Sequence, residues 1–423
     1  MTDSTDGFVP SGLAIDPARL RADLEAVNRI GTLDGVPGIN RVSFSAADMA
    51  GRHWLMQRLR DAGLTARMDA VGNVFGRWEV GAGPAVLAGS HLDTVPQGGP
   101  LDGTLGVCAA LEAVRAMQDA GLTPARPVEV VATADEEGRF GGMLGSQAIC
   151  GEVGPDWIAR AVDDAGTGLA DTLRARGLDP DASVARDPAG IAAFLELHVE
   201  QGPVLERGGA AVGVADAVSG VFNWSVTLTG EANHSGTTPM DMRRDAFRGL
   251  AEFGAALGDI VARVGGPETR LTVGKVALSP NFPHSIAGSA AFSLIGRDVD
   301  ESVMRALAAA CRRELGRAAA RHGLRVEIAE QGWLPPTRLD PAVSERLVSL
   351  AAAAGAPAVV MSSGAGHDAQ TFARHVPAGL IFVPSVGGLS HAPGEWTEWP
   401  DIACGATLLA RAIACFALSP ADP

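Results

Sequence analysis

The stretch Val128-Glu-Val-Val-Ala-Thr-Ala-Asp-Glu-Glu137 ends an apolar run with two adjacent carboxylates. The run has the length and valine content of a buried strand. Carboxylates at the end of such a strand are costly to desolvate unless charge partners lie nearby. A turn there would aim one carboxylate at a cation and leave its neighbour to handle a proton. Taken alone, however, a Glu-Glu pair is more often solvated surface. A functional role for this pair therefore depends on other residues of the chain.

Short apolar strands alternate with helical patterns on both sides of this stretch. The predicted strands are 85–90, 127–134 and 194–199, and the predicted helices are 19–30, 46–62 and 105–120. Such alternation predicts a layered α/β fold, in which ligands gather at the carboxyl ends of the strands. His91 and Asp93 follow one of these strands, and Glu136 and Glu137 follow another.

The middle of the chain has a different pattern of apolar residues. This pattern predicts strands at 223–230, 271–278, 290–297 and 324–329 and helices at 241–264 and 301–322. The order β-α-β-β-α-β is that of a ferredoxin-like α+β sandwich. The α/β pattern then resumes with strands at 358–361 and 380–384 and a closing helix at 402–418. We therefore expect an α/β catalytic domain in two parts, residues 1–213 and 331–423, interrupted by an inserted domain of residues 214–330.

Composition narrows the class of partner and the compartment. The chain has 423 residues and a formal net charge of −15, which argues against nucleic acid or an anionic membrane as a partner. The five cysteines are scattered and form no CxxC pair, as expected of free thiols in a reducing compartment. The N-terminus resembles no signal peptide, and no apolar run is long enough to span a bilayer. A cytoplasmic protein is expected.

Imidazole and carboxylate groups recur in five loops or strand ends. These segments are Gly89-Ser-His-Leu-Asp-Thr-Val-Pro96, Leu101-Asp-Gly103, Asp135-Glu-Glu-Gly138, Glu196-Leu-His-Val-Glu-Gln-Gly202 and Leu389-Ser-His-Ala-Pro-Gly-Glu395. A lone His after a strand is more often a hydrogen-bonded structural residue, and an Asp beside Gly is usually a turn former. Five such segments in one α/β frame instead predict a site for borderline divalent ions, which take these ligands.

The segments also match the motifs of a known family. The matching stretches are 89–96, 102–107, 196–206, Asn233-His-Ser-Gly-Thr-Thr-Pro-Met240, Ser363-Gly-Ala-Gly-His-Asp-Ala369, and 383–385 with 390–391. They resemble the di-zinc aminoacylase and acetylornithine-deacetylase peptidase superfamily. Within it they are most similar to the amidohydrolase/carbamoylase branch, which includes N-carbamoyl-L-amino acid hydrolases, allantoate amidohydrolases and beta-ureidopropionases. The fold this implies is a di-zinc peptidase-like α/β domain with an inserted lid and dimerisation domain.

The resemblance implies a dinuclear metal centre. Asp102 would bridge two divalent ions, with His91 and His198 completing one site and Glu137 and His391 the other. Zinc is the expected metal, and manganese, cobalt and nickel are the alternatives. The opening carboxylate pair would thus divide into a ligand and a free base.

Two further carboxylates receive roles near the metals. The resemblance makes Glu136 the general base, which accepts a proton from a metal-activated water and returns it to the leaving nitrogen. Asp93 would hold the His91 imidazole in its metal-binding tautomer, a role that chemistry also suggests for a carboxylate close to a ligand.

The inserted domain and nearby loops are expected to meet the substrate. The resemblance implies that His234 reaches the active site of a partner subunit and stabilises the oxyanion there. Arg297 matches the position that grips the substrate carboxylate, a task suited to a guanidinium fork. Gln201, Gly366 and His367 match positions that line the substrate pocket. The implied partners are a small amide or ureido acid and a second copy of the chain, bound through the inserted domain.

Three positions depart from the family pattern. His284 stands where an Asn is expected, Ile295 where an Asp precedes the carboxylate-binding Arg, and Pro100 where Arg is common. An Asn amide both donates and accepts, whereas an imidazole is larger and can be charged. The metal and base positions are intact, so the departures concern the substrate and not hydrolysis itself.

Three functional hypotheses follow. The first is a metal-dependent amidohydrolase that cleaves a C–N bond of a small N-carbamoyl or ureido-type amino acid. The second is an N-acyl amino acid deacylase or dipeptidase with the same dinuclear mechanism. The third is a catalytically silent binding module, which is expected to have lost the base or a ligand, whereas this chain retains all of them.

Overall fold

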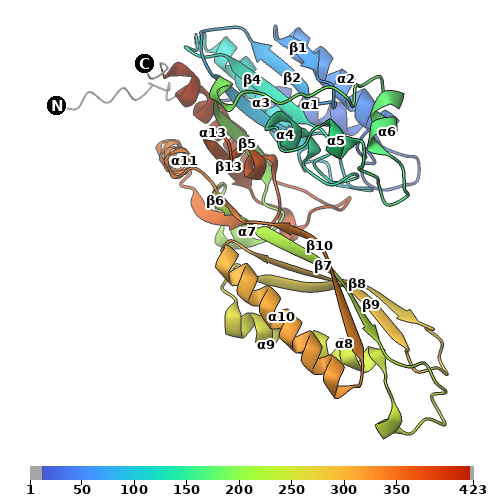
Figure 1. Cartoon of the computed structure of the whole chain (residues 1–423). Helices are drawn as coiled ribbons and strands as arrows, with labels where there is room; N and C mark the ends of the chain where they lie inside the picture. The colour runs from blue at the N-terminus through green and yellow to red at the C-terminus, as the bar shows by residue number, and fades with distance from the viewer. Residues whose placement is uncertain (1–11, 420–423) are drawn as a thin grey trace. The chain divides into compact units, whose positions relative to one another are not determined.

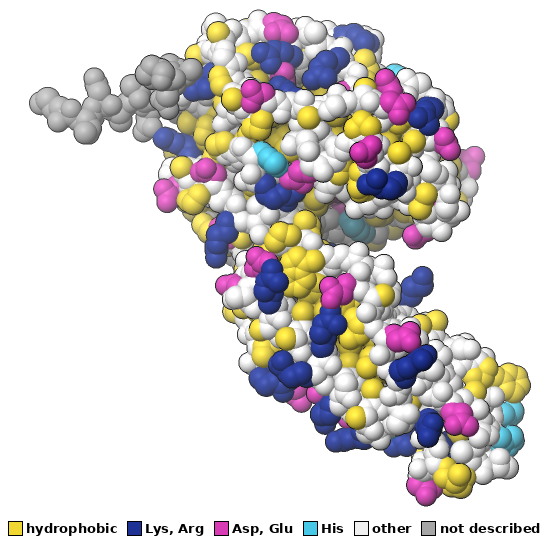
Figure 2. Space-filling view, viewed as in Figure 1, with side chains coloured by type: hydrophobic (Ala, Val, Ile, Leu, Met, Phe, Trp, Pro, Cys, Tyr) yellow, Lys and Arg dark blue, Asp and Glu magenta, His cyan; other side chains and the backbone are white. Residues whose placement is uncertain are grey.

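The computed structural model describes residues 12–419, which divide into two compact units (Figure 1). Among these residues the first unit comprises 12–216, 339–361 and 367–419, and the second comprises 217–338 and 362–366. On the face visible in Figure 2, Lys and Arg side chains are interspersed with Asp and Glu over both units, despite the net charge of −15.

A nine-stranded mixed sheet organises the α/β part, as the fold-class prediction requires. Its strands are β1 (Thr65–Met68), β2 (Val74–Trp78), β3 (Ala85–His91), β4 (Val128–Thr133), β5 (Ile191–Val199), β6 (Gly213–Val218), β11 (Thr337–Arg338), β12 (Val359–Ser363) and β13 (Ala378–Val383). The order along the sheet is β1-β2-β4-β3-β5-β13-β6-β11, with β12 paired to β6. The short strands β1, β2, β6 and β11 were not predicted from the sequence.

The centre of this sheet is parallel. Strands β4, β3, β5 and β13 are neighbours that run in one direction, while β2 and β6 flank them antiparallel. All residues of β3, β4 and β13 are buried, which accounts for the predominance of apolar residues in them. Because these four strands are parallel, their carboxyl ends meet at one edge of the sheet.

Helices cover the sheet. They are α1 (Pro17–Asn28), α2 (Ala46–Asp61), α3 (Thr104–Asp119), α4 (Leu144–Ile149), α5 (Pro155–Ile158), α6 (Leu169–Ala175), α7 (Val204–Gly208), α11 (Pro341–Ala353), α12 (Asp368–Phe372) and α13 (Trp399–Leu418). Helices α3 and α13 pack together on the central strands and supply much of the main core. A smaller core lies under α4, α5 and α6. Asp16 caps α1 by accepting the amide hydrogens of Ala18 and Arg19, which fixes the start of that helix.

Helix α13 is also apolar enough to cross a membrane. Among the described residues it is the one helix with the required length and hydropathy, and 61% of its most apolar window is buried inside the protein. It packs against α3, β5 and β13, the position of a core helix.

Glu129 is a buried carboxylate on the sheet face opposite this core. It accepts hydrogen bonds from Nη1 of Arg77 at 2.6 Å and from Nη1 of Arg186 at 2.5 Å. Burial alone would raise its pKa, but the two guanidinium groups hold the pKa of Glu129 below its usual value. A depressed folded-state pKa stabilises the protein above the unfolded-state pKa, and this stability is lost as the pH falls through the folded-state value.

Replacing this carboxylate should therefore cost stability in a pH-dependent way. Glu129→Gln is expected to lower the free energy of unfolding by about 2 kcal/mol at neutral pH, because charged hydrogen bonds to two guanidinium groups are weakened. The deficit should shrink below the usual glutamate pKa of 4.5. Urea unfolding at pH 7 and at acid pH measures both effects. Glu79→Gln, at an exposed partner of Arg77, is the control; a deficit that does not change with pH would contradict this account.

The second unit is a four-stranded antiparallel sheet with helices on one face. Its elements in chain order are β7 (Gly220–Thr229), α8 (Ala246–Ala255), α9 (Leu257–Val264), β8 (Arg270–Ser279), β9 (Ser289–Asp298), α10 (Glu301–Arg321) and β10 (Arg325–Leu334), coloured green to orange in Figure 1. The sheet order is β10-β7-β9-β8. Even-numbered residues of β7 and β9 are buried together with α8 and α10 in one core.

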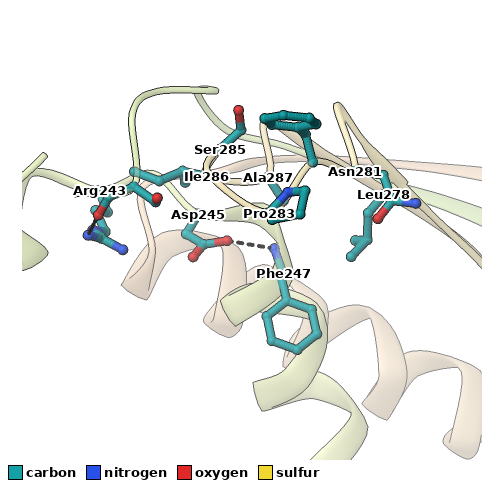
Figure 3. A pocket seen from close by; sticks show the side chains of 11 residues that line it. Arg243, Asp245, Phe247, Leu278, Asn281, Pro283, Ser285, Ile286 and Ala287 are labelled. Atoms are coloured by element: carbon teal, nitrogen blue, oxygen red, sulfur yellow. Dashed lines mark hydrogen bonds between the residues drawn. The ribbon is translucent and has the colours of Figure 1, made fainter. Parts of the chain in front are cut away.

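Two predicted elements of this unit need correction. The single helix expected at 241–264 is wrong: α8 begins after Asp245, whose carboxylate caps it by accepting the Phe247 amide hydrogen, and the helix breaks at Ala256 (Figure 3). Gly254 and Gly258 flank the break and lower helix propensity there. The strand expected at 324–329 continues to Leu334, beyond a bulge near Glu330.

Candidate active site

The predicted metal ligands come together at the carboxyl edge of the parallel strands. His91 ends β3, His198 lies near the end of β5, Glu137 follows β4 and His391 lies in the loop after β13. Asp102 comes from the loop that leads into α3. The strand order β4-β3-β5-β13 makes these ends neighbours, although the residues span 300 positions of sequence.

Asp102 is shared between two clusters of potential metal ligands. Its Oδ1 lies 3.1 Å from Nε2 of His198 and 3.5 Å from Nε2 of His91. Its Oδ2 lies 3.1 Å from Nε2 of His391, which in turn is 3.5 Å from Oε2 of Glu137. Each oxygen of the Asp102 carboxylate therefore faces a different set of potential metal ligands. This is the arrangement required of a carboxylate that bridges two metal ions.

The buried imidazoles are oriented for metal binding. Nδ1 of His91 contacts the main-chain oxygen of Asp93 at 3.0 Å, and Nδ1 of His198 contacts its neighbour's main-chain oxygen at 2.9 Å. A carbonyl only accepts, so each Nδ1 carries a proton, and each Nε2 is the ring atom that would face a bound ion. The donor set of imidazole nitrogens and carboxylate oxygens fits divalent ions of the zinc type.

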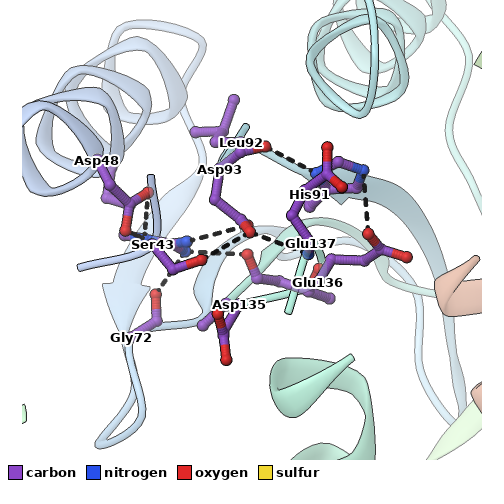
Figure 4. A network of polar contacts seen from close by, with 12 residues as sticks. Ser43, Asp48, Gly72, His91, Leu92, Asp93, Asp135, Glu136 and Glu137 are labelled. Atoms are coloured by element: carbon purple, nitrogen blue, oxygen red, sulfur yellow. Dashed lines mark hydrogen bonds and ion pairs between the residues drawn. The ribbon is translucent and has the colours of Figure 1, made fainter. Parts of the chain in front are cut away.

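Asp93 orients His91 by a different group from the one expected. The prediction gave this role to its carboxylate, but the main-chain oxygen makes the contact. The carboxylate instead accepts a hydrogen bond from Ser43 Oγ at 2.8 Å and from the Glu137 amide at 3.1 Å, and it faces the buried Arg52 guanidinium at 3.7 Å (Figure 4). The side chain thus fixes the backbone of a second ligand, because the turn after β4 folds back over it.

Glu395 holds the Asp102 loop in place. Its Oε1 accepts the amide hydrogens of Leu101 at 3.0 Å and Asp102 at 2.9 Å, and its Oε2 accepts Ser390 Oγ at 2.7 Å. The side chain is 2% exposed, so these bonds are made away from water. Glu395 lies in a predicted ligand-rich segment, but no role was predicted for it; its position four residues after His391 was the available signal.

The ionisable groups of the cluster perturb one another. His rings that hydrogen-bond to Asp102 hold the pKa of this carboxyl well below its usual value despite burial. Hydrogen bonding to Asp102 raises the pKa of His391 to about 9. Burial, followed by repulsion from Asp102, raises the pKa of Glu137 to about 7. So dense a carboxylate cluster favours bound positive charge, whether protons or metal ions.

Glu136 lies beside the first cluster without sharing Asp102. Its Oε2 is 3.6 Å from Nε2 of His91, and its side chain is 10% exposed (Figure 4). Burial, together with repulsion from Asp368, raises the pKa of Glu136 well above its usual value although His91 opposes the shift. The two adjacent carboxylates therefore separate: Glu137 points to His391, and Glu136 points to His91.

A buried layer behind His198 was not foreseen. Glu196, two residues earlier on β5, accepts hydrogen bonds from Ser90 Oγ at 2.6 Å and from the Ala369 amide at 2.9 Å. His367 stacks edge-on against His198 with ring centroids 4.5 Å apart and is 1% exposed. Such burial suits His367 to supporting the His198 ring, and its role in the substrate pocket stays a prediction. Gln201, also expected in that pocket, donates from Nε2 to Asp102.

Gly103 allows the two histidines and Asp102 to approach. Its φ is 61°, and a Cβ at this position would overlap the His91 ring. Gly103→Ala is therefore expected to displace His91 and to weaken metal binding at the first cluster by at least tenfold, roughly the effect of misplacing one ligand. Gly121→Ala is the matched control, because Gly121 has φ 66° but open space around it. Calorimetric metal titration compares them; equal affinities in both variants would contradict the steric argument.

Four predicted substrate residues belong to the second unit: His234, His284, Arg297 and Gly366. Nδ1 of His234 accepts the amide hydrogens of Gly236 at 3.0 Å and Thr237 at 3.1 Å, which leaves the proton on Nε2. His284 is exposed on the loop that begins β9 and is bridged to the His234 segment through Ser285. A 420 Å³ cavity beside these loops is lined by residues of this unit alone (Figure 3).

Arg297 lies near the end of β9 on the face that carries no helix. Its Nη1 donates to the Gly364 main-chain oxygen at 3.0 Å, and burial lowers its pKa. Ile295 shares this strand face two residues earlier. Among the described residues no carboxylate lies within ion-pair distance of Arg297, and Ile295 explains why its own strand supplies none.

Comparison with known proteins extends the resemblance over the chain. Residues 87–414 match the model of peptidase family M20/M25/M40. The chain is 36% identical over 382 residues to the N-carbamoyl-L-amino-acid amidohydrolase of Paenarthrobacter aurescens, covering 89% of this chain and 92% of that protein. It is 36% identical over 383 residues to the allantoate amidohydrolase of Escherichia coli (strain K12), with coverages of 89% and 92%.

A solved structure is also similar to this chain over nearly its whole length. The crystal structure of an amidase of the hydantoinase/carbamoylase family from Burkholderia multivorans matches with a TM-score of 0.88 and 32% sequence identity, covering 96% of this chain and 99% of that chain. Fold, ligand geometry and sequence similarity therefore agree with the resemblance seen in the loops. The chain belongs to peptidase family M20/M25/M40.

Proposed function

We propose that this protein is a metal-dependent amidohydrolase that cleaves a C–N bond of a small N-carbamoyl or ureido-type amino acid. The observation that carries the proposal is Asp102, whose two oxygens face separate donor clusters. Such an arrangement holds two divalent ions about one carboxylate. The amidohydrolase names of the relatives favour a carbamoyl or ureido substrate over a peptide.

The metal centre supplies, when bound, Lewis acidity and an acidified water. His91, His198 and Asp102 would hold one ion, and Glu137, His391 and Asp102 the other. Zinc fits these ligands, and manganese, cobalt or nickel would take the same donors.

The chain's own residues then handle the protons. Glu136 lies beside the first cluster and is not one of the proposed metal ligands. Its carboxylate is therefore available to accept the proton of the attacking water. Its raised pKa lets the protonated carboxyl persist long enough to donate to the leaving nitrogen.

His234 is suited to stabilise the developing oxyanion. Two amide hydrogens bonded to Nδ1 fix the neutral tautomer with a proton on Nε2, so the ring is a ready donor that needs no ionisation. Whether it serves its own chain or a partner depends on assembly. We propose a homodimer through the second unit, because β8 is an edge strand with mostly exposed residues. A monomer by sedimentation at full activity would contradict this.

Arg297 is proposed to bind the substrate carboxylate. Because none of the described carboxylates pairs with Arg297, its guanidinium fork is available for a bidentate contact. Arg297→Lys is expected to raise KM by about tenfold or more with a smaller change in kcat, since the lost fork binds substrate and transition state alike. Steady-state kinetics on a carboxylate substrate and on its amide analogue make the test. An equal KM change for both compounds would show that Arg297 acts elsewhere.

A substrate panel tests the proposal as a whole. Metal-free protein is reconstituted with each divalent ion and assayed against N-carbamoyl amino acids, ureido acids, N-acyl amino acids and dipeptides. Ammonia release from the carbamoyl or ureido compounds alone supports the proposal, whereas turnover confined to acyl or dipeptide substrates supports the deacylase alternative. No metal binding and no turnover would support a silent binding module. His284 makes the panel necessary, because it changes the polar group beside the expected carboxylate site. Among the described residues none of the five cysteines forms a disulfide, which supports a cytoplasmic location for the proposed enzyme.

A further inference from the structure

The cluster formed by Glu137, His391 and Oδ2 of Asp102, called the second cluster, also contains the side chain of Gln201. Nε2 of Gln201 donates to Oδ2 of Asp102 at 2.9 Å and lies 3.3 Å from Nε2 of His391. These are two of the three atoms that would hold the second ion. The atom facing Asp102 has to be the amide nitrogen, because a carboxylate accepts hydrogen bonds and would repel the amide oxygen.

Gln201 holds its side-chain amide in this cluster although its backbone is strained and its amide oxygen is unsatisfied. Gln201 has φ 59°, a left-handed conformation that non-glycine residues rarely adopt, and its main-chain amide donates to Ser385 Oγ at 3.0 Å. Its Oε1 is buried and has no hydrogen-bond partner among the described residues. Moving the side chain out of the cluster would release this unsatisfied acceptor.

The first cluster contains no comparable competitor. Its atoms, Oδ1 of Asp102 and the two Nε2 nitrogens, receive a single further donor among the described residues: the Gly103 amide at 3.3 Å from His198 Nε2. That donor is part of the main chain and contacts one ligand atom, whereas Gln201 contacts two and is carried on a rotatable side chain.

From this asymmetry we infer that Gln201 is a displaceable occupant of the second metal site, so that the two ions bind in order and with unequal affinity. The inference rests on the proposed dinuclear function. An ion entering at His91, His198 and Asp102 Oδ1 meets no side-chain competitor. An ion entering at Glu137, His391 and Asp102 Oδ2 has to displace the Gln201 amide, which then becomes free to turn toward a bound substrate.

Cobalt titration of the metal-free protein tests the inference. Calorimetry and Co²⁺ d–d absorption should resolve two binding events in the wild type, the second weaker. In Gln201→Leu the second event should tighten by about tenfold, because one hydrogen bond to a carboxylate no longer competes, while the first stays unchanged. Glu137→Gln should remove the second event alone, which assigns the two events to their sites.

Gln97→Leu is the matched control. Gln97 has φ 57°, so leucine meets the same backbone strain there, but the side chain is exposed and outside both clusters; its titration should match the wild type. Thermal melts of the metal-free proteins establish that all variants fold. Two events of equal affinity in the wild type, or an unchanged or weaker second event in Gln201→Leu, would overturn the inference but leave the dinuclear function intact. The absence of any cobalt binding would overturn both.

Discussion

Glu136→Gln is expected to lower kcat by about 10³-fold while the enzyme still binds two metal ions. A well-placed general base contributes on the order of 10²–10⁴-fold to such reactions. The amide is nearly the same size as the carboxylate, so packing around this buried side chain is preserved. Because Glu136 lies beside His91 but is not one of the five proposed ligands, the variant should still bind both ions.

The neighbouring residue provides the matched control. Glu137→Gln changes the same chemical group one position along, but Glu137 faces His391 in the second cluster. Its loss of activity should follow loss of the second ion and be partly restored by excess metal, whereas Glu136→Gln should not be rescued. Metal content by mass spectrometry and kcat at saturating metal separate the two. Metal loss in Glu136→Gln, or near wild-type turnover at full metal content, would show that the roles of the pair have been misassigned.

The part of this site that sequence could predict is the part built from strand ends. His91, Glu137, His198 and His391 each follow or end an apolar strand, and parallel strands bring such ends together. The α/β class and the β-α-β-β-α-β order were predictable for the same reason, since they depend on local periodicity.

Sequence could not show which atom makes each contact. The Glu395 carboxylate has one nearby partner, Ser390, but its other partners, Leu101 and Asp102, lie 294 and 293 residues away. Asp93 has two accepting groups, and only the folded turn decides that its main-chain oxygen meets His91. Likewise the sequence does not show that the His367 ring packs against His198, because the two residues lie far apart in the chain.

Asp102→Asn is expected to impair both metal sites at once. An asparagine offers one oxygen where the carboxylate offers two, so it can serve one cluster and presents an NH₂ group to the other. Binding should fall from two ions to at most one weakly held ion, and activity by about 10³-fold or more, since neither water activation nor substrate polarisation survives. Asp119→Asn, at the other end of α3 and exposed, should behave as wild type.

The same variant has a signature that does not require metal. Hydrogen bonding to Asp102 is the main cause that raises the pKa of His391 to about 9 in the metal-free protein. Removing the charge should bring this pKa down toward its usual value of 6.5, and an NMR titration of the histidine rings measures the shift. In the wild type, an ion has to displace the His391 proton below that pKa, so affinity at the second site should rise with pH up to about 9. In Asp102→Asn that rise should end at lower pH. If the His391 pKa stayed near its wild-type value, Asp102 would not be the group that joins His391 to the centre, and the bridging assignment would fail.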